Sequence, residues 1–527
     1  MTTDARDSRW LGVASRLVTV AALVAAVLVL SAYPFDDAFI HLRLARNLAF
    51  RGEPYFNLGE RVMSGSSPLW LSWLSAIFRV TGHASAWAAI ITECLVIAAV
   101  FFTAEGFLAR PRFRSWVTLI AAFTVAALAL PSAGGLMETP LAIALLFGGL
   151  WAYSSGRLVG AGVLLGLAGA ARFEMLLPAI GALVLAPDWR ARTRLFAGAG
   201  PVWLAQAAIL YSAFGSVLPH TMTAKAIVYQ VQRADMLNMV PPELGKRIAA
   251  TMIFILGLST TVEAVPLVPT AFGARDRSQM ALLVLAAFPL GLLAIYAVEA
   301  SFIFPWYWVL SLCPMALFAW SRVLERGSLS GVRNGVGVAA DSVFSAIAVL
   351  ALAWASVISV QAVLAGHLER SQWVMENARV RSYLTIGTVL AERCPNAVVG
   401  AAEIGALGWT FSGKILDGVG LASPEVLAYH PLRVPEERAT GVIGAIPGRA
   451  FATFRPDVVV SMGVFAEDFV SKAAVLPGLS DYVVWWKEPV FAAGLARSLP
   501  ETLWGSRWTV VFARAGRCGP TVGLARP

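Results

Sequence analysis

The chain runs from GVASRLVTVAALVAAVLVLSA, residues 12–32, directly into YPFDDAFIHLRLARN, residues 33–47. About 20 helical residues cross the hydrocarbon of a bilayer while satisfying their own backbone hydrogen bonds. Residues 12–32 are therefore predicted to span a membrane, and Asp36 and Asp37 follow at the point where the chain leaves it. Two adjacent carboxylates at a bilayer exit indicate chemistry.

The composition is that of a polytopic membrane protein. Of the 527 residues, 58% are hydrophobic and 14% are charged, whereas an ordinary soluble domain is about 25% charged. The net charge of +9 would favour nucleic acid in a soluble protein. Here the basic residues stand in short clusters between apolar runs, as they do in cytoplasmic loops of membrane proteins. We therefore expect a bilayer and no nucleic acid as the partner.

Apolar segments long enough to cross the membrane recur through the first two thirds of the chain. Eleven are expected to span it as helices, and the fold class is an α-helical polytopic membrane protein. The segments are residues 12–32, 84–108, 116–132, 138–153, 157–171, 174–187, 195–213, 248–272, 279–298, 304–321 and 339–365.

The positions of the arginines predict the orientation, because basic residues favour short cytoplasmic loops. If the N-terminal tail is cytoplasmic, the alternate loops around 110–114, 157, 190–194, 275–277 and 322–333 all carry arginine. An odd number of spans then places the rest of the chain outside. We expect a transmembrane catalytic domain over residues 1–365 and an extracytoplasmic α/β domain over residues 366–527.

The unusual polar residues gather at the outer ends of these segments. Ionisable groups are costly at membrane depth unless they face a cavity or a partner, so their common level indicates an outward-facing polar site. They are Asp36, Asp37, Glu138, Arg172, Glu174, His220, Lys225 and Glu299, with the aromatic run FPWYW at 304–308.

Residues 38–50 have the pattern of an amphipathic helix that lies on the membrane surface. Phe39 and Leu42 fall on one side, and Arg43 and Arg46 on another. A second interpretation of the aspartates stays open, because Asp is a favoured N-cap worth about 1 kcal/mol. One of the two is therefore expected to cap this helix.

Several short motifs occur in a recognisable order. They are DDAFI at 36–40, RLARN at 43–47, FNLGERV at 56–62, SPLW at 67–70, METPL at 137–141, ARFE at 171–174, FGSVLPHT at 214–221 with Lys225, AEIGAL at 402–407 and ILDGVGL at 415–421. Together they resemble the GT-C membrane glycosyltransferases, and among these the terminal β-(1→2)-arabinofuranosyltransferases of the mycobacterial cell wall. Phe173, Met175 and His220 depart from that pattern, where Pro, Gly and Asn are usual, so the chain resembles a cousin of that group.

The resemblance implies a plasma-membrane enzyme without a cofactor. It would move a sugar, arabinofuranose in the resembled group, from a polyprenyl-phosphate donor to a cell-envelope glycan acceptor on the outer face. The acceptor hydroxyl needs a base and the leaving phosphate needs a cation. Asp37 is the first candidate for the base and Asp36 the second. The candidates for binding the donor phosphate and sugar are Arg172, Lys225, His220, Arg43, Glu138 and Glu174. The five histidines are scattered without metal-ligand spacing, so no metal is expected.

Each candidate also has a structural interpretation. Arg172 and Glu174 could form an ion pair at a tight turn, and Lys225 could extend its ammonium to the membrane interface. Glu138 suits the start of a helix, and His220 could be a surface residue. The aromatic run at 304–308 could form an interface belt or stack on a sugar.

The final third is polar and carries short β-rich pieces. Strands are expected near 397–401, 414–417, 457–461, 482–486 and 508–512, with helices at 372–381 and 424–430, which favours a small α/β domain. Outside the cell a Cys394–Cys518 disulfide would tie the start of this domain to its end. Its expected role is acceptor engagement or closure of the cavity, with stabilisation as the alternative.

Other classes of function stay open at this point. A transporter would distribute charges through the depth of its helices and often has internal repeats, and neither is found. A scaffold would leave the acid pair and the cations without a purpose. Within the enzyme class, a mannosyl-type GT-C transferase acting on protein or lipid is the alternative.

Overall fold

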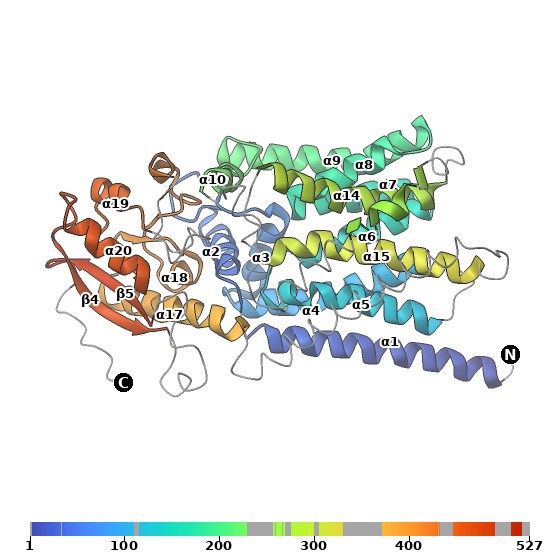
Figure 1. Cartoon of the computed structure of the whole chain (residues 1–527), viewed down its shortest axis with the longest axis horizontal. Helices are drawn as coiled ribbons and strands as arrows, with labels where there is room; N and C mark the ends of the chain where they lie inside the picture. The colour runs from blue at the N-terminus through green and yellow to red at the C-terminus, as the bar shows by residue number, and fades with distance from the viewer. Residues whose placement is uncertain are drawn as a thin grey trace.

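The computed structural model describes residues 3–32, 34–109, 115–228, 257–258, 260–265, 267–268, 276–299, 305–329, 372–430, 432, 446–490 and 507–518. Within these residues, six helices are long and apolar enough to cross a membrane. They lie in α1 (Thr3–Leu30), α4 (Ala86–Leu108), α5 (Ser115–Gly134), α9 (Trp189–Phe214), α14 (Arg277–Glu299) and α15 (Pro305–Leu329). The protein is thus a multi-pass membrane protein, and these helices form an elongated bundle (Figure 1).

Three shorter apolar helices complete the described bundle. They are α6 (Thr139–Ser154), α7 (Leu158–Ala171) and α8 (Leu176–Val184), and the single turn η1 (Phe173–Met175) joins the last two. The helices therefore coincide with nine of the eleven expected segments. Of the other two, 248–272 is described only in part and 339–365 lies outside the described residues.

Small residues set the closest packing in the bundle. A Cβ atom at Gly162 of α7 would lie 2.0 Å from the Leu195 carbonyl oxygen, and one at Gly198 of α9 would lie 2.1 Å from the Val159 oxygen. Only glycine permits this approach of two backbones, a common device between membrane helices. The close packing of α7 on α9 therefore depends on these two glycines.

Three helices lie between the bundle and the C-terminal domain: α2 (Asp36–Arg51), α3 (Pro68–Thr81) and α10 (His220–Val228) (Figure 1). Ser67 caps α3 by accepting the Trp70 N–H, with Pro68 in the first turn. The expected helix over 38–50 is present as α2, but its polar side does not face water. Most of its side chains are buried, including Arg43.

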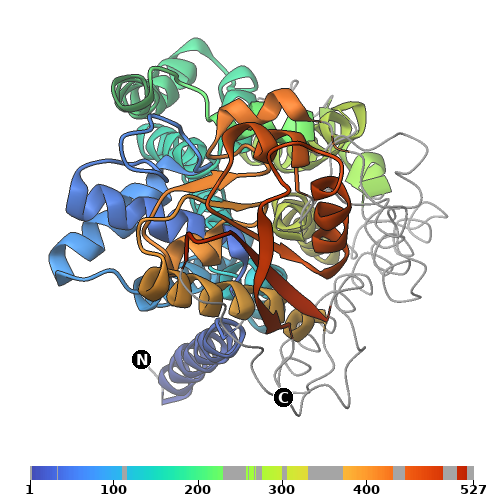
Figure 2. The ribbon, with the colours of Figure 1, turned by 90° about the vertical axis from the view of Figure 1, so that its left-hand side faces the viewer.

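The C-terminal domain is built on a five-stranded mixed sheet. The strands are β1 (Val399–Ala401), β2 (Ile415–Asp417), β3 (Val458–Met462), β4 (Tyr482–Pro489) and β5 (Trp508–Arg514), in the order β2-β1-β3-β5-β4. The first three are parallel, whereas β5 is antiparallel to β3 and β4. All five expected strands are confirmed, and Figure 2, viewed from the end that carries this domain, shows the sheet in front of the bundle.

The two faces of the sheet pack on different helices. Along β3, Val459 belongs to a core with Phe451 of α19 (Gly448–Phe454) and Phe469 of α20 (Gly463–Ala473). Its neighbours Val458 and Val460 point the other way and join the core that continues through α17 (Gln372–Arg393) into the helices of the bundle. The alternation of a strand thus connects the domain to the membrane part.

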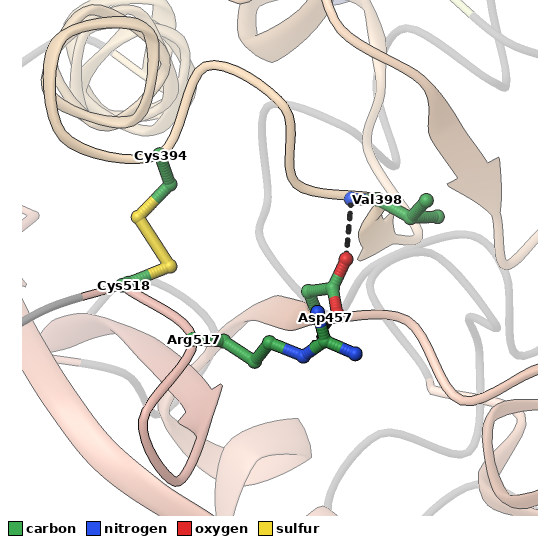
Figure 3. Close-up of a disulfide and its surroundings, with 5 residues drawn as sticks. All are labelled: Cys394, Val398, Asp457, Arg517 and Cys518. Atoms are coloured by element: carbon green, nitrogen blue, oxygen red, sulfur yellow. Dashed lines mark hydrogen bonds and ion pairs between the residues drawn. A yellow bond between two sulfur atoms is a disulfide. The ribbon is translucent and has the colours of Figure 1, made fainter.

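A disulfide joins Cys394, after α17, to Cys518, after β5 (Figure 3). The two Cα atoms are 5.3 Å apart. Beside it, Asp457 accepts the Val398 N–H at 3.0 Å and pairs with Arg517 at 3.2 Å. The expected link between the start and the end of the domain is confirmed.

Candidate active site

A narrow pocket lies where α2, α10, α15 and a loop of the C-terminal domain meet. Its free volume is about 10 Å³, which is room for about one water molecule. The lining residues come from segments far apart in sequence: Asp37, Ile40, His41, Ser64, Ser66, Met137, Thr221, Lys225, Trp306 and Leu421.

Asp37 and Lys225 face each other in this pocket. The Lys225 Nζ atom is 3.9 Å from Asp37 Oδ2, and both side chains are about a quarter exposed, at 22% and 28% respectively. A partly exposed pair at this distance adds little to stability. It places a carboxylate and an ammonium at one opening, which is the arrangement expected from the sequence.

Tyr307 of α15 connects Lys225 to Arg172. Lys225 donates a hydrogen bond to the Tyr307 hydroxyl at 2.9 Å, and the Arg172 guanidinium carbon lies 4.5 Å from the centre of the Tyr307 ring. Burial lowers the pKa of Lys225, but Tyr307 and Asp37 outweigh it, so the pKa is raised overall. Lys225 is therefore a cation at physiological pH.

Arg172 lies behind the pocket and not in its lining. Its guanidinium donates to Glu138 at 2.8 Å, to Thr139 at 3.2 Å and to both Glu174 oxygens at 2.7 and 3.2 Å. Four of its five N–H donors are thereby used. The ion pair with Glu174 that the sequence allowed is present, and Arg172 supports the Tyr307 ring from one side.

Glu138 and His41 extend the polar cluster from Arg172 to the pocket. His41 Nδ1 lies 3.4 Å from Glu138 Oε2, and Ser66 donates to the other Glu138 oxygen at 3.3 Å. Burial lowers the pKa of His41, against the opposing effect of Glu138, so the imidazole is neutral at pH 7. Leu136, two residues before Glu138, has φ +59°. A positive φ is strained for a bulky residue and persists only where the surrounding structure holds it.

Asp36 does not face the pocket, although it is adjacent to Asp37. Its two oxygens accept the backbone N–H groups of Gly405 and Ala406 at 2.9 and 2.8 Å, in the first turn of α18 (Gly405–Thr410). Burial raises the pKa of Asp36, while Arg379 and these N–H groups oppose the shift. The expectation that one aspartate caps its own helix is corrected: no side chain caps α2, and Asp36 binds the start of another helix.

Arg43 does not face the pocket either. Its guanidinium donates to the carbonyl oxygens of Phe56 at 2.8 Å, Gly408 at 2.9 Å, Phe411 at 2.7 Å and Gly413 at 2.8 Å. The side chain is buried at 2% exposure. Because its donors are used by backbone carbonyls, the structure does not bring Arg43 to a donor phosphate.

His220 stands beside the pocket, next to the lining residue Thr221. Its Nε2 lies 3.0 Å from the Gly420 carbonyl oxygen, in the loop that follows β2. The same loop places Leu421 in the pocket lining. His220 therefore holds a loop of the C-terminal domain over the site.

Sequence reasoning missed some of the residues at the site. His41 lies four residues after Asp37, so helical spacing places it on the same face, and this signal could have identified it. Trp306 and Tyr307 carried only an interface-belt or stacking interpretation, since no local pattern shows which aromatic residues turn inward. Within the described part of the chain, no three His, Cys, Asp or Glu side chains are grouped as metal ligands.

Comparison by sequence gives one family match. A family model described as a domain of unknown function, DUF8728, matches residues 369–515. This range includes the whole sheet and its helices. No curated protein matches the chain at a significant level.

Comparison by structure finds solved proteins of similar fold over most of the chain. ArnT from Cupriavidus metallidurans, solved with undecaprenyl phosphate, is 14% identical with a TM-score of 0.51, over 96% of this chain and 99% of that one. The oligosaccharyltransferase of Archaeoglobus fulgidus is 12% identical with a TM-score of 0.51, over 89% and 73%. At such identities the likeness establishes the fold alone, and the chain has a GT-C-like fold.

Proposed function

We propose that the protein is a membrane glycosyltransferase that uses a polyprenyl-phosphate sugar and acts at the outer face of the plasma membrane. The observation that carries the proposal is the Asp37–Lys225 pair, 3.9 Å apart in the pocket. The GT-C-like fold supports it, since a protein of similar fold binds undecaprenyl phosphate. The acceptor is a hydroxyl group of a cell-envelope glycan.

Each charge of the pair has a role in the transfer. The acceptor oxygen bonds to the anomeric carbon while the bond from that carbon to the phosphate oxygen breaks. Asp37 takes the acceptor proton, and the electron pair leaves with the polyprenyl phosphate, whose charge Lys225 binds. A phosphate on Lys225 replaces Asp37 as the partner of the ammonium, so donor binding frees the base.

The other candidate residues support this pair. Arg172, held by Glu138 and Glu174, fixes the Tyr307 ring beside Lys225. A neutral His41 accepts or donates a hydrogen bond to a sugar hydroxyl. Because the free volume is about 10 Å³, donor binding needs the pocket to widen. Leu421, in the loop after β2, is the lining residue that belongs to the C-terminal domain, so a movement of this loop would widen the pocket.

The motifs at 36–70 and 214–225 support arabinofuranose as the sugar, and a mannosyl-type donor is the alternative. The unit over 366–527 engages the acceptor next to the transmembrane unit over 1–365. A panel of polyprenyl-phosphate sugars in proteoliposomes distinguishes the donors, since one of them should be consumed at least tenfold faster than the rest.

The test of the reaction is Asp37→Asn in proteoliposomes that contain this donor panel and a glycan acceptor. Loss of the general base should lower transfer by about 10²- to 10⁴-fold, and Lys225→Ala should also lower it. Glu467→Gln, on the exposed surface of α20, is the matched control and should transfer normally. Unchanged transfer by a well-folded Asp37→Asn protein would reject Asp37 as the base.

A further inference from the structure

A second and larger cavity lies inside the membrane part, away from the pocket. Its volume is about 360 Å³, within the range of small-molecule sites. It is bounded by α4, α6, the turn that follows α6 and Leu164 in the middle of α7. The lining residues are Val96, Ala99, Thr103, Leu141, Ala144, Leu145, Gly148, Trp151, Ala152, Ser155, Arg157 and Leu164.

One continuous face of α6 forms the floor of this trough. Its residues recur at the spacing of three or four that keeps one face of a helix, from Leu141 to Ala152. The eleven helical steps from Leu141 to Ala152 measure about 16 Å, which is about half of a hydrocarbon core that is about 30 Å thick. The trough thus has the length of one leaflet.

The trough is apolar along its length and basic at one end only. Ala99, Ala144 and Gly148 leave space where larger side chains would fill it. Ser155 and Arg157 close the end that follows α6, and both are exposed. Arg277 adds a second guanidinium, because a Cβ at the adjacent Gly156 would lie 3.0 Å from its Nη1 atom.

This distribution of charge points to an amphiphile with an anionic head group. We propose that the trough binds one anionic phospholipid of the surrounding bilayer, with an acyl chain against α6 and the phosphate at Arg157. Glu138 lies just before the start of α6, and the basic end of the trough lies just after its end. The 16-residue helix separates them by about 24 Å. A donor whose phosphate is bound near Lys225 cannot present the same phosphate there, so the lipid is distinct from the donor.

The test uses the purified full chain in mild detergent with phosphatidylglycerol or phosphatidylcholine at equal concentration, and native mass spectrometry counts the retained lipids. One phosphatidylglycerol should be retained in preference to phosphatidylcholine. Arg157→Ala should weaken that retention about fivefold, as expected for one basic residue near anionic lipid. Ala152→Phe, which fills the trough, should abolish it.

Two substitutions of the same kind serve as controls. Arg190→Ala removes an exposed arginine outside the trough, and Ala205→Phe enlarges an exposed residue of α9. Both should retain phosphatidylglycerol as the unchanged protein does. Equal retention in all five proteins, or equal retention of the two lipids, would overturn the proposal. The proposal would also be overturned if polyprenyl phosphate were added and the Arg157→Ala and Ala152→Phe proteins lost retention of that lipid alone.

Discussion

Asp36 and Asp37 are adjacent in the sequence, yet their carboxylates serve different parts of the molecule. Asp37 faces Lys225 in the pocket, whereas Asp36 binds two backbone N–H groups of the C-terminal domain. Successive residues of a helix are turned by about 100° from each other, because 3.6 residues make one turn. A pair of acids at the start of α2 can therefore bind one domain through Asp36 and present the Asp37 carboxylate to the pocket.

The contacts on the Asp36 side form a clamp between α2 and α18. Asp36 binds the start of α18, while Arg43 and Arg46 donate to carbonyl oxygens at its end. A Cβ at Gly405 would lie 1.9 Å from the Asp36 carbonyl oxygen, so the two backbones meet without a side chain between them. We therefore expect substitutions in the clamp to lower stability and substitutions in the pocket to lower transfer.

Arg43→Ala should give the largest loss of stability. It removes a buried cation that donates to four carbonyl oxygens. Phe56 and Gly408 keep a longer hydrogen bond from Asn47 and Arg46, but the remaining contacts are lost, which should lower the free energy of unfolding by about 3–5 kcal/mol. Thermal denaturation followed by size-exclusion chromatography measures the loss. Arg51→Ala, an exposed arginine at the end of the same helix, should leave the midpoint unchanged. An Arg43→Ala protein as stable as this control would show that the clamp carries little energy.

The Cys394–Cys518 disulfide should rank next. Its removal by Cys394→Ser with Cys518→Ser should cost about 2–4 kcal/mol, because it closes a long loop in the unfolded chain. The midpoint of thermal denaturation reports it. Cys94→Ser, which changes a free and half-buried cysteine, is the control. A reducing agent should reproduce the double substitution, and a midpoint that ignores both treatments would contradict the prediction.

Asp417, at the end of β2, should make the free energy of unfolding of the C-terminal domain depend on pH. Burial raises its pKa from 3.8 to about 6, although the backbone N–H groups of Ala422 and Val419 oppose the shift. Between these pKa values the folded state binds more protons than the unfolded state, so the free energy of unfolding falls as pH rises from about 4 to about 6. The fall should reach about 3 kcal/mol, at 1.36 kcal/mol per pKa unit.

Asp417→Asn provides the measurement for this dependence. The difference in thermal midpoint between the unchanged protein and the variant should shrink or reverse across that range of pH. A difference that is constant from pH 4 to pH 7 would mean that Asp417 keeps its ordinary pKa. The loop after Asp417 places Leu421 at the pocket, so the carboxyl that changes protonation belongs to a segment of the pocket lining.

Hydropathy located nine of the helices, and short β-rich runs located the five strands. The expected common level of the polar residues brought Asp37, Lys225, Arg172, Glu138 and Glu174 to one cluster. The roles of Asp36 and Arg43 were beyond this reasoning, because their partners lie 369 and 365 residues away. The polar residues of α2 have the spacing of a helix with one side in water. In the structure, Arg43 and Arg46 on that side donate to backbone carbonyl oxygens instead of to water.

The smallest effect, and the most direct test of the comparison, is expected from Asp36→Asn. The substituted amide keeps one oxygen for the α18 backbone but points N–H donors at the other N–H group. It should therefore cost about 1–2 kcal/mol. Transfer should fall by less than tenfold, because α2 stays in place and Asp37 is unchanged. Asp37→Asn is the matched control, with the opposite profile of normal stability and lost transfer.

The pH profile separates a positioning role from a catalytic one. If Asp36 only positions α18, the profile of transfer in Asp36→Asn keeps the shape of the unchanged protein at lower amplitude. An Asp36→Asn enzyme that loses transfer as completely as Asp37→Asn, with an unaltered thermal midpoint, would reverse the assignment. The base would then be Asp36, and the clamp would have to open during the reaction, since both of its oxygens are bound to α18.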